Sequence, residues 1–442
     1  MNQVHDELRE HVFSLPIVDT HEHLPAHEAD RPMGNDVLAE YLGHYFSCDL
    51  VSAGLTPEGL ETARDATGPL AKRWKLIEPF WQAARNTGYG RSLDIAARDL
   101  YGFDRIDGQT IGPLNEAFCA ARQRGQTYRD VLSRRSNIRV SVLDALANPD
   151  DGCDRQFFRP ALRLDDFVMA ANQGALRALA RRAGVEAIHN LGDLEDACER
   201  FLDRAIQVGI ACLKSGLAYL RPLRYDRPTR AAAEEEFNEL FSDRNYMCVE
   251  QNWFGVTRKL QDYMMHHVCR LADRRGLTFQ IHTGLQEGNG NYVQHSDPSL
   301  LTNLFMAYPN VRFDLFHIGY PYQQTVAALA KNFRNVFIDF AWAHIISPTA
   351  AVNALVEYLD AVPANKISGF GGDYIFVDGV YGHQTIAREN IARALTIKVE
   401  QGVFDLDRAK EVARMLLHDN PLAIFHLGDV VKAKHPAKKR KP

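Results

Sequence analysis

Residues 16–25 read LPIVDTHEHL, an apolar run that leads directly into acidic and histidine side chains. The run LPIV has the length and the β-branched content of a buried parallel strand. Residues two apart on a strand point to the same side. His21 and His23 are therefore predicted to face together, with Asp19 deeper on the same side and Glu22 facing away.

From residue 138 onward the sequence alternates short β-branched or apolar runs with longer helical patterns, which is typical of βα units. Seven further strands are expected at 138–144, 158–165, 209–215, 277–284, 311–319, 336–342 and 366–374. The helical pattern at 190–209 has an Asp cap and a following glycine, and the pattern at 383–402 has Ile386, Ile391 and Leu395 as its inner stripe. Eight parallel strands with helical crossovers predict an α/β fold, the TIM (β/α)8 barrel, whose chemistry lies where the strands end.

Residues 24–137 do not follow this alternation. The segment is rich in aromatic residues and helical patterns, and it is too long and too structured to be a loop. We expect a helical insertion over the barrel mouth, within a single barrel domain at 1–428. The basic residues 429–442 are expected to form a disordered tail, with a localisation or anion-binding tract as the alternative.

Composition excludes several classes of function. The net charge of −5 over 442 residues gives no field that would favour nucleic acid. No apolar stretch approaches the roughly 20 residues of a membrane helix, and the N-terminus has no signal-peptide pattern. The seven scattered cysteines form no C-x-x-C pair, so reduced thiols are expected. A soluble, cytoplasmic protein without nucleic-acid or membrane partners is predicted.

Side chains suited to metal binding stand at the ends of five predicted strands. They are His21 and His23 on the first strand, Lys214 on the fourth, His282 on the fifth, His317 on the sixth and Asp373 on the eighth. Imidazole and carboxylate groups are the usual ligands of zinc and similar ions. A single strand-end histidine among the 17 in this chain would be unremarkable, but the joint pattern predicts a metal site at the barrel mouth.

This set of residues, in this order, resembles the amidohydrolase superfamily. The stretches HTGLQEGNGN (282–291), FDLFHIGYPY (313–322), ISGFGGDYIFVDGVYGH (367–383) and DNPLAIFHL (419–427) are similar to its amidohydrolase-2 and uronate isomerase-like branch. The resemblance implies that the metal ligands are His21, His23, Lys214, His282, His317 and Asp373. It implies one or two divalent ions, zinc first and manganese as the alternative, with a carboxylated Lys214 as bridge if there are two. A salt bridge from Lys214 to an acid at the mouth is the competing interpretation.

The resemblance also implies a reaction, in which Asp373, Lys214 and His317 are the catalytic residues. A metal-activated water, with Asp373 as general base, would cleave a small amide, lactone or ester that bears a carboxylate. Aldose–ketose isomerisation of a uronate is the main alternative, decarboxylation is a third reaction, and an inactive metal-binding scaffold ranks last. The same ligand types serve hydrolysis and isomerisation.

The predicted substrate-binding residues lie at the end of the third strand and after the fourth and seventh strands. Arg163 is the preferred anchor, with Arg221 and Arg224 as alternatives, because a guanidinium grips a carboxylate at two points. Tyr219 is a candidate because it lies just beyond Lys214 in the same stretch. Trp342 is a pocket-lining candidate, with His344 beside it, and the glycine-rich loop at 284–291 is a candidate lid. The expected partners are a small acidic substrate and further copies of the chain in a homo-oligomer.

Overall fold

The computed structural model describes residues 3–144, 148–241 and 257–428. One parallel sheet of eight strands lies at its centre, and each strand pairs with the next along the chain. The strands are β1 (Ile17–Glu22), β2 (Ile138–Leu143), β3 (Phe158–Arg163), β4 (Cys212–Ser215), β5 (Thr278–Ile281), β6 (Arg312–Leu315), β7 (Val336–Asp339) and β8 (Ile367–Ser368). The predicted barrel fold is confirmed. The basic tail at 429–442 lies outside the described residues.

The segment after β8 closes the barrel against β1. Thr20 N donates to Phe370 O at 3.2 Å, Asp373 N donates to His21 O at 2.8 Å, and His23 N donates to the carbonyl of residue 374 at 3.1 Å. These bonds join β1 to irregular backbone rather than to a long eighth strand. The closure therefore brings the first and last predicted ligands to the same edge.

The strands β5 to β8 end three or more residues before their predicted ends, because the residues after them leave the extended conformation. His317 (φ 63°), Trp342 (φ 62°) and Asp373 (φ 55°) have left-handed backbone, which is uncommon for residues other than glycine. Residues 282–284 also lie beyond the end of β5. The strand-end side chains are thus presented from tight turns, whose local strain is common at functional sites.

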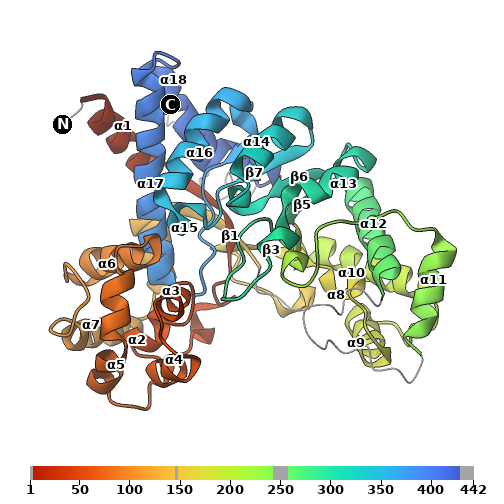
Figure 1. The fold of residues 1–442 in the computed structure, drawn as a ribbon, viewed down its shortest axis with the longest axis horizontal. Helices are drawn as coiled ribbons and strands as arrows, with labels where there is room; N and C mark the ends of the chain where they lie inside the picture. The colour runs from red at the N-terminus through yellow and green to blue at the C-terminus, as the bar shows by residue number, and fades with distance from the viewer. Residues whose placement is uncertain (1–2, 145–147, 242–256, 429–442) are drawn as a thin grey trace, which may run out of the picture.

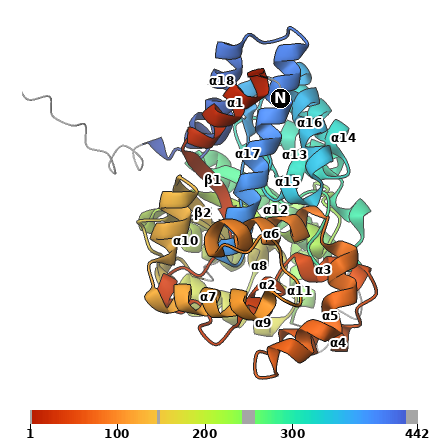
Figure 2. The ribbon, with the colours of Figure 1, turned by 90° about the vertical axis from the view of Figure 1, so that its left-hand side faces the viewer.

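The helices that follow the strands surround the sheet (Figure 1). They are α8 (Asp165–Val168), α9 (Gln173–Ala183), α10 (Leu191–Val208), α11 (Arg230–Glu239), α12 (Arg258–Arg275), α13 (Thr302–Ala307), α14 (Gln323–Asn332), α15 (Ala343–Ile346), α16 (Pro348–Ala361), α17 (Val377–Glu400), α18 (Leu406–Arg414) and α19 (Asn420–Ile424). The N-terminal α1 (Gln3–Ser14) packs against α17 and α18, as Figure 2 shows. In the part of the chain that is described, no helix combines the length and the apolarity needed to cross a membrane.

The cap of α10 differs from the predicted aspartate. Asn190 is the N-cap, and its side chain accepts a hydrogen bond from Asp193 N, whereas the Asp193 carboxylate accepts from His189 N at 2.8 Å. The predicted glycine does end the helix, since Gly209 has left-handed backbone at φ 89°. The long helix α17 begins at Val377, six residues before the predicted start, and buries Ile386, Ile391 and Leu395 as expected.

The insertion between β1 and β2 is helical, as predicted. It contains α2 (Val37–Tyr41), α3 (Phe46–Ser52), α4 (Pro57–Arg64), α5 (Leu70–Ala84), α6 (Gly88–Tyr101), α7 (Ile111–Arg124) and a π-helical turn at Tyr128–Arg135. In Figure 1 these helices gather at the lower left, where α6 packs against α17. The buried carboxylate of Asp378, at the start of α17, accepts hydrogen bonds from the Tyr41 and Tyr101 hydroxyls at 2.8 and 2.9 Å. This contact fixes the insertion against the barrel.

Candidate metal centre

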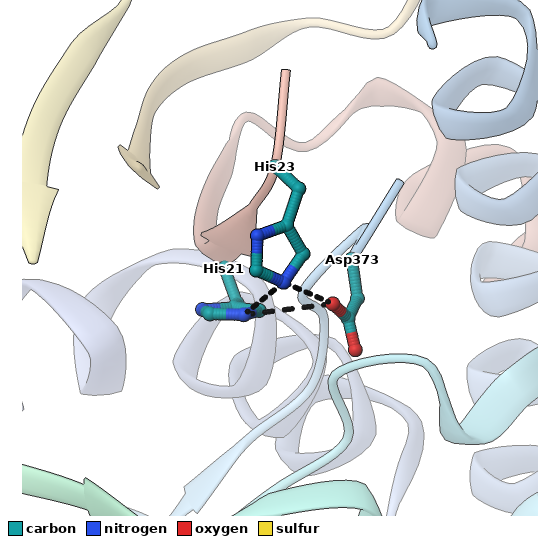
Figure 3. A group of neighbouring side chains, drawn as sticks. All are labelled: His21, His23 and Asp373. Carbon is teal, nitrogen blue, oxygen red and sulfur yellow. Dashed lines mark hydrogen bonds and ion pairs between the residues drawn. The ribbon is translucent and has the colours of Figure 1, made fainter. Parts of the chain in front are cut away.

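Three potential metal ligands meet where β1 and the segment after β8 come together (Figure 3). His21 Nε2 lies 3.2 Å from His23 Nε2, and Asp373 Oδ1 lies 3.5 and 3.3 Å from these two nitrogens. Ligands of a tetrahedral zinc ion, with bonds of roughly 2.0–2.1 Å, are about 3.4 Å apart. The triangle of donors therefore has the size that a small divalent ion needs.

Hydrogen bonding fixes the tautomer of neutral His23 in the form that can bind a metal. Its Nδ1 lies 2.7 Å from the Asp144 carbonyl oxygen. Because a carbonyl only accepts, Nδ1 carries the proton and the Nε2 lone pair points at His21 and Asp373. Burial, with Lys214 nearby, lowers the pKa of His21 well below its usual value and keeps this imidazole neutral. Burial acts to lower the pKa of His23 too, but Asp373 and Asp144 outweigh it and raise that pKa, so a bound cation replaces a proton at His23. The donor set thus fits a cation.

His282 and His317 form a second pair of the same kind. His282 Nε2 lies 2.8 Å from Leu285 O, and His317 Nδ1 lies 2.8 Å from Ala341 O, so these two nitrogens carry the protons. The other two, His282 Nδ1 and His317 Nε2, then face each other with lone pairs at 3.0 Å. Burial lowers the pKa of His317 to about 4 and lowers that of His282 well below its usual value. A metal ion is a better partner for this pair than a proton.

Lys214 is buried beside both groups of histidines. Its Nζ lies 3.4 Å from the centroid of the Phe316 ring, and within the described ranges no carboxylate oxygen comes within 4.0 Å of it. Desolvation lowers the pKa of Lys214 to about 8, although Asp144 and Asp373 act to raise it. The structure therefore does not show the direct salt bridge that was the competing interpretation of Lys214.

The backbone around Asp373 is held on several sides. Asp373 N donates to His21 O at 2.8 Å, and Gly372 N donates to Asp19 Oδ1 at 3.0 Å. His383 Nδ1 donates to Gly372 O at 2.9 Å. Asp19 Oδ2 also accepts a hydrogen bond from the Ser141 hydroxyl of β2 at 2.9 Å. This support keeps Asp373 in its left-handed conformation, and positioning of this kind tunes a ligand.

Glu22, which the sequence left without a role, is fully buried and supports the same segment. Its Oε2 accepts a hydrogen bond from Tyr374 N at 3.0 Å. A Cβ on Gly372 would lie 1.8 Å from Glu22 Oε1, so this close approach requires glycine. The carboxylate and the turn that presents Asp373 are therefore packed directly against each other.

We expect Glu22→Ala to weaken metal binding by roughly 10–100-fold, the usual cost of losing a group that orients a ligand. The reason is that Tyr374 N loses its acceptor and the turn at Asp373 is released. Glu22→Gln keeps an oxygen in the same place and should stay close to wild type. Competition with a metal-chelating dye measures both affinities, and equal affinities for the alanine and wild-type proteins would contradict this role.

A cavity of about 260 Å³ opens onto these groups. Its walls include His21, His23, Arg163, Lys214, Tyr219, His282 and Asp373 from the predicted set, and His44, Tyr45, Gly216 and Glu287 in addition. The Arg163 guanidinium donates to Asp144 through Nε at 2.9 Å and Nη2 at 2.6 Å. Burial acts to raise the pKa of Asp144, but the Arg163 guanidinium outweighs this effect, so the pKa lies below its usual value. His317 lies behind this wall, against His282.

Comparison with known proteins agrees with this geometry. The family model described as amidohydrolase matches residues 18–427. The chain belongs to the amidohydrolase family. The predicted resemblance is therefore confirmed for nearly the whole length of this amidohydrolase.

Two solved structures share the fold of this amidohydrolase almost from end to end. The uronate isomerase of Thermotoga maritima is 14% identical, with a TM-score of 0.77 over 96% of this chain and 98% of that chain. The glucuronate isomerase of Caulobacter crescentus is 18% identical, with a TM-score of 0.76 over 96% and 94%. Among curated proteins, the protein fluG of Emericella nidulans is 25% identical over 178 residues, which is 39% of the amidohydrolase and only 20% of fluG.

Three predicted substrate-binding residues of the amidohydrolase do not line the cavity. Arg221 is fully buried and donates to Asp262 Oδ1 at 2.5 Å and to Gln261 Oε1 at 2.9 Å, so it fastens a loop to α12. Arg224 is exposed and pairs with Asp226 at 3.0 Å. Trp342 is buried behind His317, with ring centroids 5.1 Å apart. His344, its neighbour in the prediction, is buried and hydrogen-bonds to Gly369 O at 2.9 Å.

Besides Glu22 and Gly216, four residues at the site of the amidohydrolase escaped prediction. Asp144 ends a predicted strand, so the strand-end rule that found His282 would also have found it. His44 and Tyr45 come from the insertion, where no strand-end pattern exists. Tyr45 stacks on Trp342 with centroids 4.5 Å apart. Glu287 lies in the glycine-rich loop, whose composition predicted mobility but not a particular side chain.

Proposed function

We propose that this amidohydrolase is a metal-dependent hydrolase of a small amide, lactone or ester that bears a carboxylate. The environment of Lys214 carries the proposal, because its Nζ lies over Phe316 without an ion-pair partner among the described residues. An ammonium group cannot bind a metal. Carboxylated by carbon dioxide, the same lysine is an anion with two oxygens that can bridge two ions. This supports a centre with one ion at His21, His23 and Asp373 and another at His282 and His317.

The remaining groups supply proton transfer and orientation. Burial acts to raise the pKa of Asp373, but the surrounding imidazoles, with His23 as a hydrogen-bond partner, hold it well below its usual value, so the carboxylate is ionised at neutral pH. We assign it to accept a proton from the attacking water and to return it to the leaving group. Arg163 can hold a substrate carboxylate with Nη1, since its Nε and Nη2 bind Asp144. A divalent ion held by these ligands supplies Lewis acidity toward water and a carbonyl oxygen.

Isomerisation of a uronate is the second candidate. The observation that favours it is the similarity to two sugar-acid isomerases over 96% of the chain, which includes the helical insertion. Such a reaction has no bond to hydrolyse and works with a single ion. With a single ion, a carboxylated Lys214 would have no second ion to bind. Hydrolysis is therefore the leading proposal.

Metal content separates the two candidates. Protein purified without chelator, in the presence of bicarbonate, should contain about two equivalents of metal per chain by elemental mass spectrometry if it is a two-ion hydrolase. Amides, lactones and esters of small acids would then be screened for hydrolysis. About one equivalent, together with aldose–ketose interconversion of glucuronate, would replace hydrolysis by isomerisation. Protein that takes up neither zinc nor manganese would rule out both.

A further inference from the structure

Glu287 is an acidic side chain on the wall of the cavity, on the loop after β5. Its carboxylate is approached by the Cys48 thiol, with Sγ 3.7 Å from Oε1. In the described ranges no cationic nitrogen lies within 4.0 Å of it. A carboxylate that faces a small cavity without a cation has acceptor capacity left for a ligand.

The loop that carries Glu287 is tied down on both sides of the cavity. Glu287 N donates to the Tyr219 hydroxyl at 3.0 Å, and Asn291 Nδ2 donates to Glu287 O at 3.1 Å. Asn289 Nδ2 donates to Cys48 O at 3.2 Å, which joins the loop to α3 of the insertion. The backbone of Glu287 is therefore held between the residues after β4 and the insertion, and its carboxylate lies against Cys48 of the insertion.

Arg163 gives the same cavity a positive wall. Its side chain is 43% exposed, with Nε and Nη2 on Asp144. A Cβ on Gly216 would lie 2.8 Å from Nη1, so the guanidinium lies directly on this glycine, which also lines the cavity. Tyr219, whose hydroxyl accepts from Glu287 N, lines the cavity together with Arg163 and Glu287. The cavity thus presents a cation and an anion to one ligand.

We propose that Glu287 is a specificity-determining residue. It selects substrates that have a carboxylate at one end, bound by Arg163, and a hydrogen-bond donor, hydroxyl or ammonium, at the other end. The substrate class is then a small carboxylate with donors at its other end, and a plain dicarboxylate is rejected by charge repulsion. The inference rests on the proposed function for the carboxylate but does not require hydrolysis.

Binding of matched acids to the metal-loaded protein tests this proposal. One series is hexanoate, 6-hydroxyhexanoate, 6-aminohexanoate and adipate, and a second series has the corresponding four-carbon acids. Isothermal titration calorimetry should find the hydroxy or amino acid bound about tenfold more tightly than the unsubstituted acid, with the dicarboxylate weakest. The hydroxyl and ammonium members show which donor is preferred.

Glu287→Gln should remove most of the preference for the amino acid over the dicarboxylate, whereas Glu58→Gln, at an exposed position on α4, should leave it unchanged. An unaltered ranking in Glu287→Gln, tightest binding of the dicarboxylate, or no binding by any member would overturn the proposal. Failure of the hydrolase proposal is seen separately, in the metal content and in the absence of turnover.

Discussion

Replacing His21 with alanine should leave the protein folded and remove the ion held by His21, His23 and Asp373. His21 Nε2 is one corner of the donor triangle, 3.2 and 3.5 Å from the other two corners. The variant keeps His23, Asp373 and, when it is carboxylated, Lys214, and a zinc site that loses one of its few protein ligands binds the ion far more weakly. The loss of metal affinity should exceed the roughly 10–100-fold that follows loss of a group behind a ligand. Activity on any substrate found in the screen should fall with it.

Elemental mass spectrometry measures the lost ion, and circular dichroism checks that the barrel remains. The barrel should survive because the backbone of β1, not the His21 side chain, pairs with β2. His11→Ala is a suitable control, since His11 lies on α1 and contacts Lys410 O. A metal content of His21→Ala equal to that of wild type would contradict the assignment of this centre.

Replacing Lys214 with methionine should reduce the metal content from about two ions to about one and abolish hydrolysis. Methionine fits the apolar surroundings of Phe316 but cannot be carboxylated. With carbon-13 bicarbonate, wild type should show a carbamate carbon by NMR that the variant lacks. Lys75→Met, on the exposed side of α5, is the matched control. An unchanged metal content in Lys214→Met would show that the lysine is a plain amine.

The pH dependence of the Lys214 carbamate has a definite sign. Carboxylation needs the neutral amine, and burial lowers the pKa of Lys214 to about 8. At a constant concentration of dissolved carbon dioxide, the ammonium form dominates below that pH and the carbamate signal should decline, whereas above it the signal should rise. A lysine with an ordinary pKa would still be largely protonated at pH 8 to 9, so the midpoint of this titration also tests whether the site is desolvated.

The sequence predicted the barrel and the convergence of ligands because both follow from periodicity. Alternating strand and helix patterns fix which residues end parallel strands, and those ends share one edge. The backbone after the strands was not predictable in the same way. His317 and Asp373 have positive φ values, and they hydrogen-bond to Ala341 and His21, which are close in space and distant in sequence.

Long-range partners also explain the predictions that did not lead to the cavity. Arg221 lies a few residues after Lys214, where a substrate contact was reasonable. Its guanidinium instead forms a buried ion pair with Asp262 on α12. Nothing in the local sequence marks that pairing. Tyr45 is the converse case, a residue of the site that was not predicted. It reaches the site only because the insertion packs against Trp342.

The helical insertion has a consequence for how such an enzyme changes over evolutionary time. The ligand side chains come from the ends of barrel strands, whereas His44 and Tyr45 come from the helical insertion. Mutations in that segment can remodel the shape of the cavity without disturbing the donor triangle. A lineage, or a laboratory library confined to residues 24–137, can therefore explore new substrates while it keeps an inherited reaction intact.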